Sequence, residues 1–206
     1  MRKILLLGGG GHCKACIDVI EAENIHEIYG ILVPDYDLKD TVLGYRVIGH
    51  YADLPSHIRT ANTALIAVGQ IKTADPRVQL FEDLETKGLA FPVIQSPLAH
   101  RSKHSAVGKG TILMHGAVVN AHATIGNNCI INSHALIEHD AEIGDHCHVS
   151  TGARVNGGVV VGERSFVGSG VVIKQGVRIG ANVVIGAGQT VLKDLPDGSW
   201  VMGAAS

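Results

Sequence analysis

His139 and Asp140 are adjacent residues whose side chains are suited to acid–base chemistry. A neutral imidazole, with an ordinary pKa of about 6.5, can take a proton from an amine as the amine attacks a thioester. The neighbouring carboxylate can orient the ring and stabilise the imidazolium that results. The pair therefore predicts a general base for acyl transfer to an amine.

A run of four glycines at residues 8–11, followed by His12, is suited to binding an anionic ligand. It lies between an expected strand at residues 3–7 and an expected helix at residues 12–22, where bare amides and the helix N-terminus favour phosphate oxygens. Four glycines exceed what a turn needs, and His12 would face whatever the loop holds. A tight turn with a capping role is the alternative, because Cys13 occupies the third glycine position of the dinucleotide fingerprint.

The segment that carries His139 repeats every six residues from residue 107 to residue 190, through fourteen hexads. Each hexad opens with an aliphatic residue, its fifth residue is small or slim, and its second is often glycine, as at corners where the backbone turns. A period of six fits neither a helix nor an ordinary strand, but it suits a parallel β-helix whose short strands stack coil upon coil. The openers are Val107, Leu113, Val119, Ile125, Ile131, Ile137, Ile143, Val149, Val155, Val161, Val167, Ile173, Ile179 and Ile185.

Three hexads make one triangular coil, so residues eighteen apart stack in a column with a spacing of about 4.8 Å. This rule places Gly157 one coil beyond His139, on the same corner. A residue without a side chain leaves room there for an acyl group, and its amide could donate a hydrogen bond to the oxyanion of a tetrahedral intermediate.

The first third of the chain has a different pattern, in which apolar runs alternate with helical segments. We expect further strands at residues 27–33, 64–68 and 91–94, a short extended piece at residues 45–48 and a helix at residues 75–87. This alternation predicts a small parallel sheet with Rossmann-like winding. The chain is therefore expected to divide into an α/β domain at residues 1–96 and a β-helix at residues 97–206.

Composition excludes several classes of protein. The chain has 17 Lys and Arg against 19 Asp and Glu, a net charge of −2, which gives no electrostatic reason to expect nucleic acid or an anionic membrane as a partner. The apolar run at residues 4–7 is too short for a signal peptide, and none reaches the ~18 residues of a membrane helix. We expect a cytoplasmic protein. Its four cysteines are too few for a disulfide framework and are expected to pack inside: Cys13, Cys16, Cys129 and Cys147.

The glycine loop ending at Gly10, Gly11 and His12, the strand end at residues 67–69 and the hexad repeat together resemble one family over nearly the whole chain. It is the hexapeptide-repeat family of bacterial sugar acetyltransferases, which includes the UDP-4-amino-sugar N-acetyltransferase of bacillosamine synthesis, the perosamine N-acetyltransferases and the sialic acid O-acetyltransferases. The resemblance implies a left-handed β-helix and a nucleotide-sugar held by the N-terminal domain. It also implies acetyl-CoA as co-substrate, lying along the β-helix between the subunits of a homotrimer.

The resemblance also implies roles for individual residues. His139 matches the catalytic histidine, Asp140 its acidic partner and Gly157 the oxyanion glycine. His148 matches a second histidine that contacts acetyl-CoA. Of two consecutive acidic residues that contact the base in the bacillosamine enzyme, Asp35 matches one, whereas Pro34 stands at the other. The remaining implied positions are Gly10, Gly11, His12, Ala67 and Gly69 for the nucleotide-sugar, and Ser169 and Ala187 for the CoA groove.

The implied reaction is acetyl transfer from acetyl-CoA to the 4-amino group of a nucleotide-linked dideoxy-amino-sugar, for a surface glycan or glycoprotein. A UDP-linked sugar is favoured, and a GDP-linked sugar is the other possibility. Two alternatives are O-acetylation of a sialic acid and a protein that binds a nucleotide-sugar without catalysis.

The histidines raise a third alternative, a zinc enzyme. The γ-class carbonic anhydrases hold zinc on the same kind of helix with three histidines, two of them five residues apart, and His134 and His139 have that spacing. Leu98 stands where the third ligand would lie, and such an enzyme has no need of the glycine-loop domain, so we expect no metal. The remaining histidines, including His115 and His146, are expected to face solvent.

Overall fold

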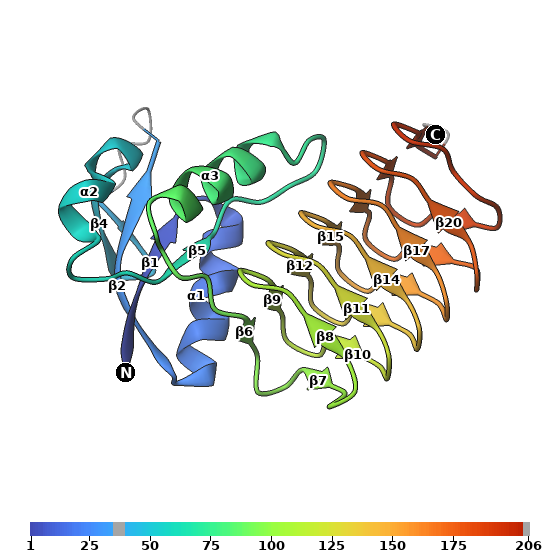
Figure 1. Ribbon diagram of the computed structural model, residues 1–206, viewed down its shortest axis with the longest axis horizontal. Helices are drawn as coiled ribbons and strands as arrows, with labels where there is room; N and C mark the ends of the chain where they lie inside the picture. The colour runs from blue at the N-terminus through green and yellow to red at the C-terminus, as the bar shows by residue number, and fades with distance from the viewer. Residues whose placement is uncertain (35–39, 204–206) are drawn as a thin grey trace.

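The computed structural model describes residues 1–34 and 40–203 and shows an α/β domain followed by a left-handed parallel β-helix (Figure 1). Asp35, one of the expected substrate-binding residues, lies outside the described residues. Both predicted halves of the fold are confirmed. The division between residues 96 and 97 stays a prediction.

The N-terminal part is a five-stranded sheet in the order β3-β4-β2-β1-β5, parallel except for β3. Alternate residues of the inner strand β1 face opposite sides: Ile4 and Leu6 pack with α1, and Leu5 and Leu7 pack with α3. The result is a three-layer α/β arrangement. Its elements are β1 (Arg2–Leu7), α1 (Gly11–Glu23), β2 (His26–Val33), β3 (Thr41–Val42), β4 (Tyr45–His50), a 3-10 turn (Tyr51–Asp53), α2 (Leu54–His57), β5 (Ala64–Ile66) and α3 (Asp75–Thr86).

The strand expected at residues 91–94 is wrong. Ala90 makes only an isolated bridge to Thr63, and the next strand, β6 (Ile94–Gln95), pairs instead with the β-helix. Ile94 is fully buried in a cluster that includes α1. A short apolar run shows that a segment is buried, but not which of two sheets it joins.

The β-helix has three sheets, and every strand pairing except the last joins residues eighteen apart, as in Leu136 with Arg154. In the last one Val184 pairs with Trp200, sixteen residues further on. We call the first sheet the docking face because α1 packs on it. It comprises β6 (Ile94–Gln95), β9 (Ile112–Leu113), β12 (Ile130–Ile131), β15 (His148–Val149), β18 (Phe166–Val167), β21 (Val184–Ile185) and β23 (Trp200–Val201). The second face comprises β7 (His100–Arg101), β10 (Val118–Val119), β13 (Leu136–Ile137), β16 (Arg154–Val155), β19 (Val172–Ile173) and β22 (Thr190–Val191). The third face comprises β8 (Ala106–Val107), β11 (Thr124–Ile125), β14 (Glu142–Ile143), β17 (Val160–Val161) and β20 (Arg178–Ile179).

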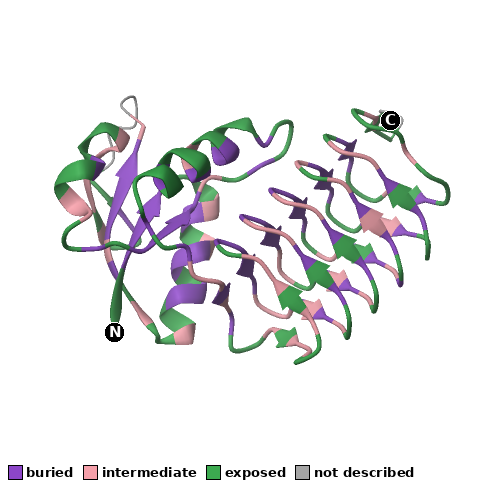
Figure 2. Cartoon of the chain, viewed as in Figure 1, coloured by how far each residue is buried: buried purple, intermediate pink, exposed green. Residues whose placement is uncertain are grey.

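Hexad openers and fifth residues fill the interior of the prism, which explains the size restriction in the repeat. Ala135, Ala141, Cys129 and Cys147 are all 0% exposed. Inserting a larger side chain at such a site typically costs about 1–3 kcal/mol through overpacking. All four cysteines are free and buried, as expected, and burial raises the pKa of the Cys129 thiol to about 12. Figure 2 shows the buried strands of the sheet and of the docking face.

Three corners join the faces. The first corner links the docking face to the second face, the far corner links the second to the third, and the return corner links the third back to the docking face. Helix α1 lies on the docking face, where its residues share a buried cluster with Ile112 and Ile130 (Figure 1). The far corner is therefore the edge of the prism opposite the α/β domain of the same chain.

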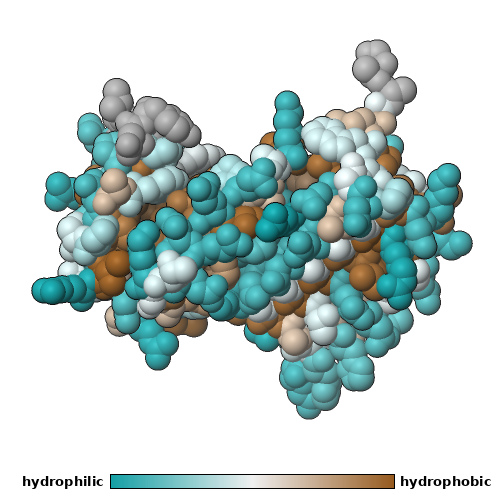
Figure 3. Space-filling model, turned by 45° about the horizontal axis from the view of Figure 1, so that its top comes forward, coloured by the Kyte–Doolittle hydropathy of each residue, from teal (hydrophilic) through white to brown (hydrophobic). Residues whose placement is uncertain are grey.

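Within the described residues, no helix is long and apolar enough to cross a bilayer. Polar side chains predominate on the face shown in Figure 3, and apolar surface is visible between them.

Candidate functional site

The predicted base and its partner lie at the far corner, between β13 and β14. His139 Nδ1 lies 2.8 Å from Asp140 Oδ2. A carboxylate only accepts, so Nδ1 carries the hydrogen and Nε2 of the neutral ring is the basic atom. The hydrogen bond to Asp140 raises the pKa of His139 above its ordinary value. His139 is exposed in the single chain, with 57% of its side chain accessible.

Gly157 lies directly against this imidazole, one coil further on. A Cβ on Gly157 would lie 2.7 Å from His139 Cε1 and 2.8 Å from Nε2. Only glycine fits this contact without moving the ring. Within residues 1–34 and 40–203, no hydrogen bond uses the Gly157 amide, whereas the next amide, that of Gly158, donates to the His139 carbonyl. The structure thus brings together His139, Asp140 and Gly157, as the spacing predicted.

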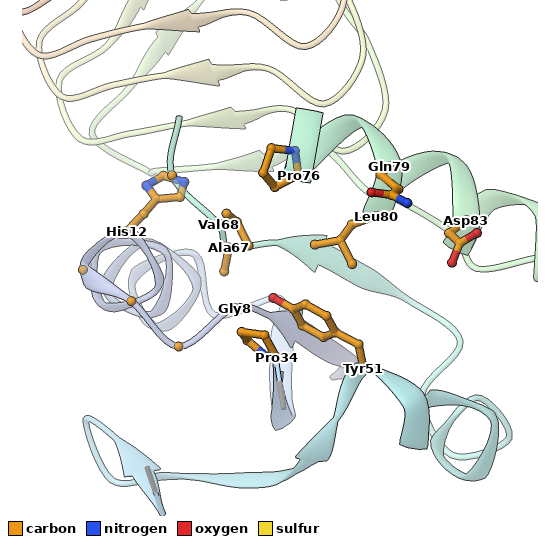
Figure 4. A pocket seen from close by; sticks show the side chains of 14 residues that line it. Gly8, His12, Pro34, Tyr51, Ala67, Val68, Pro76, Gln79, Leu80 and Asp83 are labelled. Carbon is orange, nitrogen blue, oxygen red and sulfur yellow. The ribbon is translucent and has the colours of Figure 1, made fainter. Parts of the chain in front are cut away.

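A cavity of about 640 Å³ opens beside the glycine loop, where β1, β2 and β5 end. Figure 4 shows Tyr51 and Leu80 pointing into it, with His12 at one end, on α1, and Asp83 at the other, on α3. This edge of a parallel sheet is where ligands bind in open α/β folds. Of the expected substrate residues, the cavity is lined by Gly10, Gly11, His12, Ala67 and Gly69.

The N-terminus of α1 faces this cavity without a side-chain cap. Gly10 is the N-cap residue, it makes no side-chain cap hydrogen bond, and the first turn contains no acidic residue. A Cβ on Gly10 or Gly11 would meet nothing within 4 Å. The first-turn amides therefore have open space in front of them, as an anionic group requires.

Gly8 has a packing role instead. Its φ is +113°, and a Cβ there would lie 2.8 Å from Val68 Cγ2. The close approach of the loop to the end of β5 therefore requires glycine.

A second cavity of about 460 Å³ lies between α1, the segment after β5 and the docking face. It shares Gly11, His12 and Gly69 with the first cavity, and Asn132 and His148 close it on the β-helix side. The two cavities therefore adjoin each other at the N-terminus of α1. Sequence reasoning missed Asn132, whose place in the cavity depends on how the α/β domain docks.

His148 is buried with both ring nitrogens occupied. Its Nδ1–H donates to the Gln70 carbonyl at 2.7 Å, and Asn132 Nδ2 donates to its Nε2 at 3.2 Å. Burial lowers the pKa of His148 to about 4, and burial likewise lowers the pKa of His12 to about 3. Both rings are neutral at physiological pH. The Cys16 thiol lies 3.4 Å from His12 Nε2.

Ser169 and Ala187 lie on the first corner, where both are exposed. Ser169 Oγ lies 3.0 Å from Ser150 Oγ. The first corner adjoins the docking face, so these two residues lie on the side of His148. In one chain the expected site residues thus form two groups on two different edges of the prism.

Two histidines expected to face solvent are structural. His146 is 7% exposed and accepts a hydrogen bond from Asn128 Nδ2 at 3.0 Å. His115 joins Ser96 Oγ, 2.7 Å from Nδ1, to Asp18 Oδ2, 2.9 Å from Nε2. The chain of contacts has the order of a catalytic triad, but Ser96 is 0% exposed, so it can only link α1 to the β-helix. The repeat predicted the corners but not what would cover them.

The zinc alternative needs a cluster of ligands. In the described part of the chain, no group of three or more His, Cys, Asp or Glu residues is placed to hold a metal ion. His122 Nδ1 lies 3.7 Å from Asp140 Oδ1.

The fold, the glycine-loop cavity and the histidine at a β-helix corner define an acyltransferase of the hexapeptide-repeat class with an N-terminal α/β domain. Residues 3–84 match the PglD N-terminal domain. Residues 104–139, 140–175 and 158–191 match the bacterial transferase hexapeptide (six repeats). A comparison with curated proteins finds no match.

Solved structures extend these matches to the whole chain. A variant of perosamine N-acetyltransferase from Caulobacter crescentus, in complex with CoA and GDP-perosamine, is 32% identical with a TM-score of 0.93, over 98% of this chain and 94% of that one. The acetyltransferase domain of PglB from Neisseria gonorrhoeae, in complex with acetyl coenzyme A, is 30% identical with a TM-score of 0.89, over 97% and 95%. WeeI from Acinetobacter baumannii, 24% identical with a TM-score of 0.86 over 98% and 97%, shares the fold. The chain belongs to the hexapeptide-repeat family of bacterial sugar acetyltransferases.

Proposed function

We propose that the protein transfers the acetyl group of acetyl-CoA to the 4-amino group of a nucleotide-linked dideoxy-amino-sugar. The contact between His139 and Gly157 carries the proposal, because it places a basic nitrogen beside a backbone amide free to receive an oxyanion. The relatives in complex with CoA, acetyl coenzyme A and GDP-perosamine support the choice of both substrates.

Each far-corner residue has a distinct role in this reaction. The sugar amine attacks the thioester carbonyl while His139 Nε2 takes its proton. Asp140 holds the ring through Nδ1 and stabilises the imidazolium. The amide of Gly157 donates to the oxyanion of the tetrahedral intermediate, which collapses with release of the CoA thiol. Both ring nitrogens of His148 are already hydrogen-bonded, so at the acetyl-CoA site His148 offers the surface of its ring and no free N–H donor.

The glycine-loop cavity is the proposed site of the nucleotide-sugar. The uncapped amides at Gly10 and Gly11 suit the diphosphate, and His12 presents a neutral ring at the junction of the two cavities. The rest of the first cavity offers the ring of Tyr51 and the apolar surface of Leu80 to the nucleoside. Asp35 is proposed as a further contact to the base.

The active site is proposed to form between subunits of a homotrimer. The sugar cavity lies at the docking face and the proposed CoA-lining residues Ser169 and Ala187 at the first corner, whereas His139 lies at the far corner. The first and far corners flank the same second face. If second faces turn toward a common axis, the first corner of each subunit meets the far corner of the next, a head-to-tail contact that closes into a ring. Such a ring completes the site three times.

A direct test is to incubate the protein with acetyl-CoA and a panel of UDP- and GDP-linked 4-amino sugars, with a sialic acid as a further acceptor, and to follow release of free thiol. We expect thiol release with one of the nucleotide-linked amino sugars and formation of its N-acetyl product. The nucleotide-sugar that reacts identifies the nucleobase that the cavity accepts. Release with the sialic acid alone, or binding without release from any arm, would overturn the proposal.

A further inference from the structure

Arg77 is a fully buried arginine that touches both the α/β domain and the β-helix. It lies on α3 and is 1% exposed. Its Nη1 donates to the carbonyls of Ile66 and Val68 at 2.9 and 2.5 Å. Its Nη2 donates to the backbone carbonyl of Asn128, on the return corner, at 2.9 Å and to Asn128 Oδ1 at 2.8 Å. One guanidinium thus joins two parts of the chain.

The two carbonyls on the sheet side belong to an open strand edge. β5 is the outermost strand, and the amide of Ala67 is directed to β1, where it donates to Leu7. The carbonyls of the alternate residues Ile66 and Val68 therefore point away from the sheet. At the start of the strand this edge is closed by the bridge to Ala90, and at its end by Arg77. The guanidinium takes the place of a further strand.

The link to the β-helix is reciprocal. Asn128 is 0% exposed, and its Nδ2 donates to the backbone carbonyl of Arg77 at 3.2 Å as well as to His146 Nδ1. The φ of Asn128 is +51°, a conformation that asparagine tolerates better than most residues. The Asn128 side chain is therefore hydrogen-bonded both to α3, through Arg77, and to the β-helix, through His146.

The contact between Arg77 and Asn128 holds the end of β5 and the residues that follow it, which line both cavities. Ala67, Val68 and Gly69 line the first cavity, and Gly69 and Gln70 line the second. We propose that Arg77 and Asn128 form a clamp that positions the carboxyl end of β5 for binding of the nucleotide-sugar. The clamp rests on the proposed function, because that function assigns the first cavity to this substrate. Arg77 acts as a positioning residue, since it is buried, lines neither of the two cavities, and makes none of its contacts at the far corner.

Asn128→Gly tests the clamp with little risk to the fold. Glycine accepts the positive φ and keeps the backbone carbonyl that Arg77 binds, so the variant removes only the side-chain contacts. Asn182→Gly is the matched control: Asn182 lies on the same corner three coils later, with φ +54°, and is exposed. Arg77→Lys is a second variant, because one ammonium cannot bridge both sides.

Three measurements report on the clamp: titration of GDP, UDP and CoA, steady-state kinetics, and amide hydrogen exchange of the ligand-free protein over residues 64–70. We expect Asn128→Gly to weaken nucleoside diphosphate binding and to raise KM for the nucleotide-sugar, each by about tenfold. Amide exchange over residues 64–70 of Asn128→Gly should become faster, while its KM for acetyl-CoA stays unchanged. The Asn182→Gly control should keep the wild-type melting temperature. A general loss of structure would instead alter both KM values together.

Wild-type affinity and unchanged exchange in a folded Asn128→Gly protein would overturn the clamp. If the wild-type protein binds neither GDP nor UDP, the assignment of the cavity fails instead, and the exchange measurement still decides whether the clamp holds β5.

Discussion

The imidazole of His139 and the backbone of Gly157 are in contact across one coil of the β-helix, and a single added Cβ would lie 2.7 Å from the ring. The contact places the basic ring of His139 beside the backbone amide of Gly157 with no other residue between them. A side chain at residue 157 would therefore displace the ring, because the two residues occupy adjacent coils of a stiff prism.

Gly157→Ala should lower kcat/KM by about two orders of magnitude, because the added methyl displaces His139 and fills the space for the acetyl group. Steady-state thiol release measures the effect. Gln175→Ala, on the same corner one coil further, is the control and should stay within about twofold of the wild-type protein. A Gly157→Ala protein with full activity would remove the oxyanion role.

His139→Ala should lower kcat by about two orders of magnitude or more while leaving the affinity for the nucleotide-sugar largely unchanged. The separation is expected because the cavity residues lie at the docking face and His139 at the far corner. Turnover and calorimetric titration test it together. His104→Ala, another exposed corner histidine, should behave as the wild-type protein. Unchanged turnover in His139→Ala would exclude it from the mechanism.

Asp140→Asn should shift the acidic limb of the pH–rate profile to lower pH. Asp140 raises the pKa of His139 because it stabilises the imidazolium, so its removal lets the ring lose its proton at a lower pH. The base is then neutral over a wider range but weaker, and the plateau of kcat should fall. The profile of kcat/KM from pH 5 to 9 shows both effects. If the acidic inflection of the profile stays at the wild-type pH, Asp140 does not influence the pKa of His139.

Two inactive variants should restore activity when they assemble together. Gly11→Glu fits sterically, since a Cβ at Gly11 meets nothing within 4 Å, but it places a carboxylate where the diphosphate is expected. When the Gly11→Glu and His139→Ala proteins are refolded together, some trimers contain both kinds of subunit. At some of their interfaces the intact cavity of a His139→Ala subunit meets the intact His139 of a Gly11→Glu subunit. Light scattering should show a trimer, and the mixture should regain part of the wild-type turnover. A monomer, or a mixture as inactive as its components, would contradict the shared site.

The free energy of unfolding should fall as the pH is lowered from about 6.5 toward 4. The pKa of His148 is about 4 in the folded protein and about 6.5 when unfolded, so between these values only the unfolded chain binds the proton. The loss is up to about 1.4 kcal/mol per pH unit for such a group. His12 acts in the same direction. Denaturant titrations at several pH values measure the slope, which His148→Gln should reduce. A slope identical to that of the wild-type protein would show that His148 does not contribute.

The sequence by itself determined the β-helix, its register and the far corner. The hexad repeat sets the number of residues in a coil, and stacked strands convert a separation of eighteen residues into a contact, so His139 and Gly157 could be paired before any coordinates. The uncapped glycine loop could be predicted in the same way, because strand, loop and helix are consecutive. In both cases the positions follow from distance along the chain.

Only the tertiary structure decided how the two domains meet. The partners of Arg77 are 9, 11 and 51 residues away, and His148 binds Gln70 across 78 residues. No repeat relates these segments, since they come together only when α1 and α3 pack against the β-helix. The same packing buries His146 and places the cavity opposite His139. Docking depends on the shapes of two finished surfaces, and a periodic pattern in either one does not specify the fit between them.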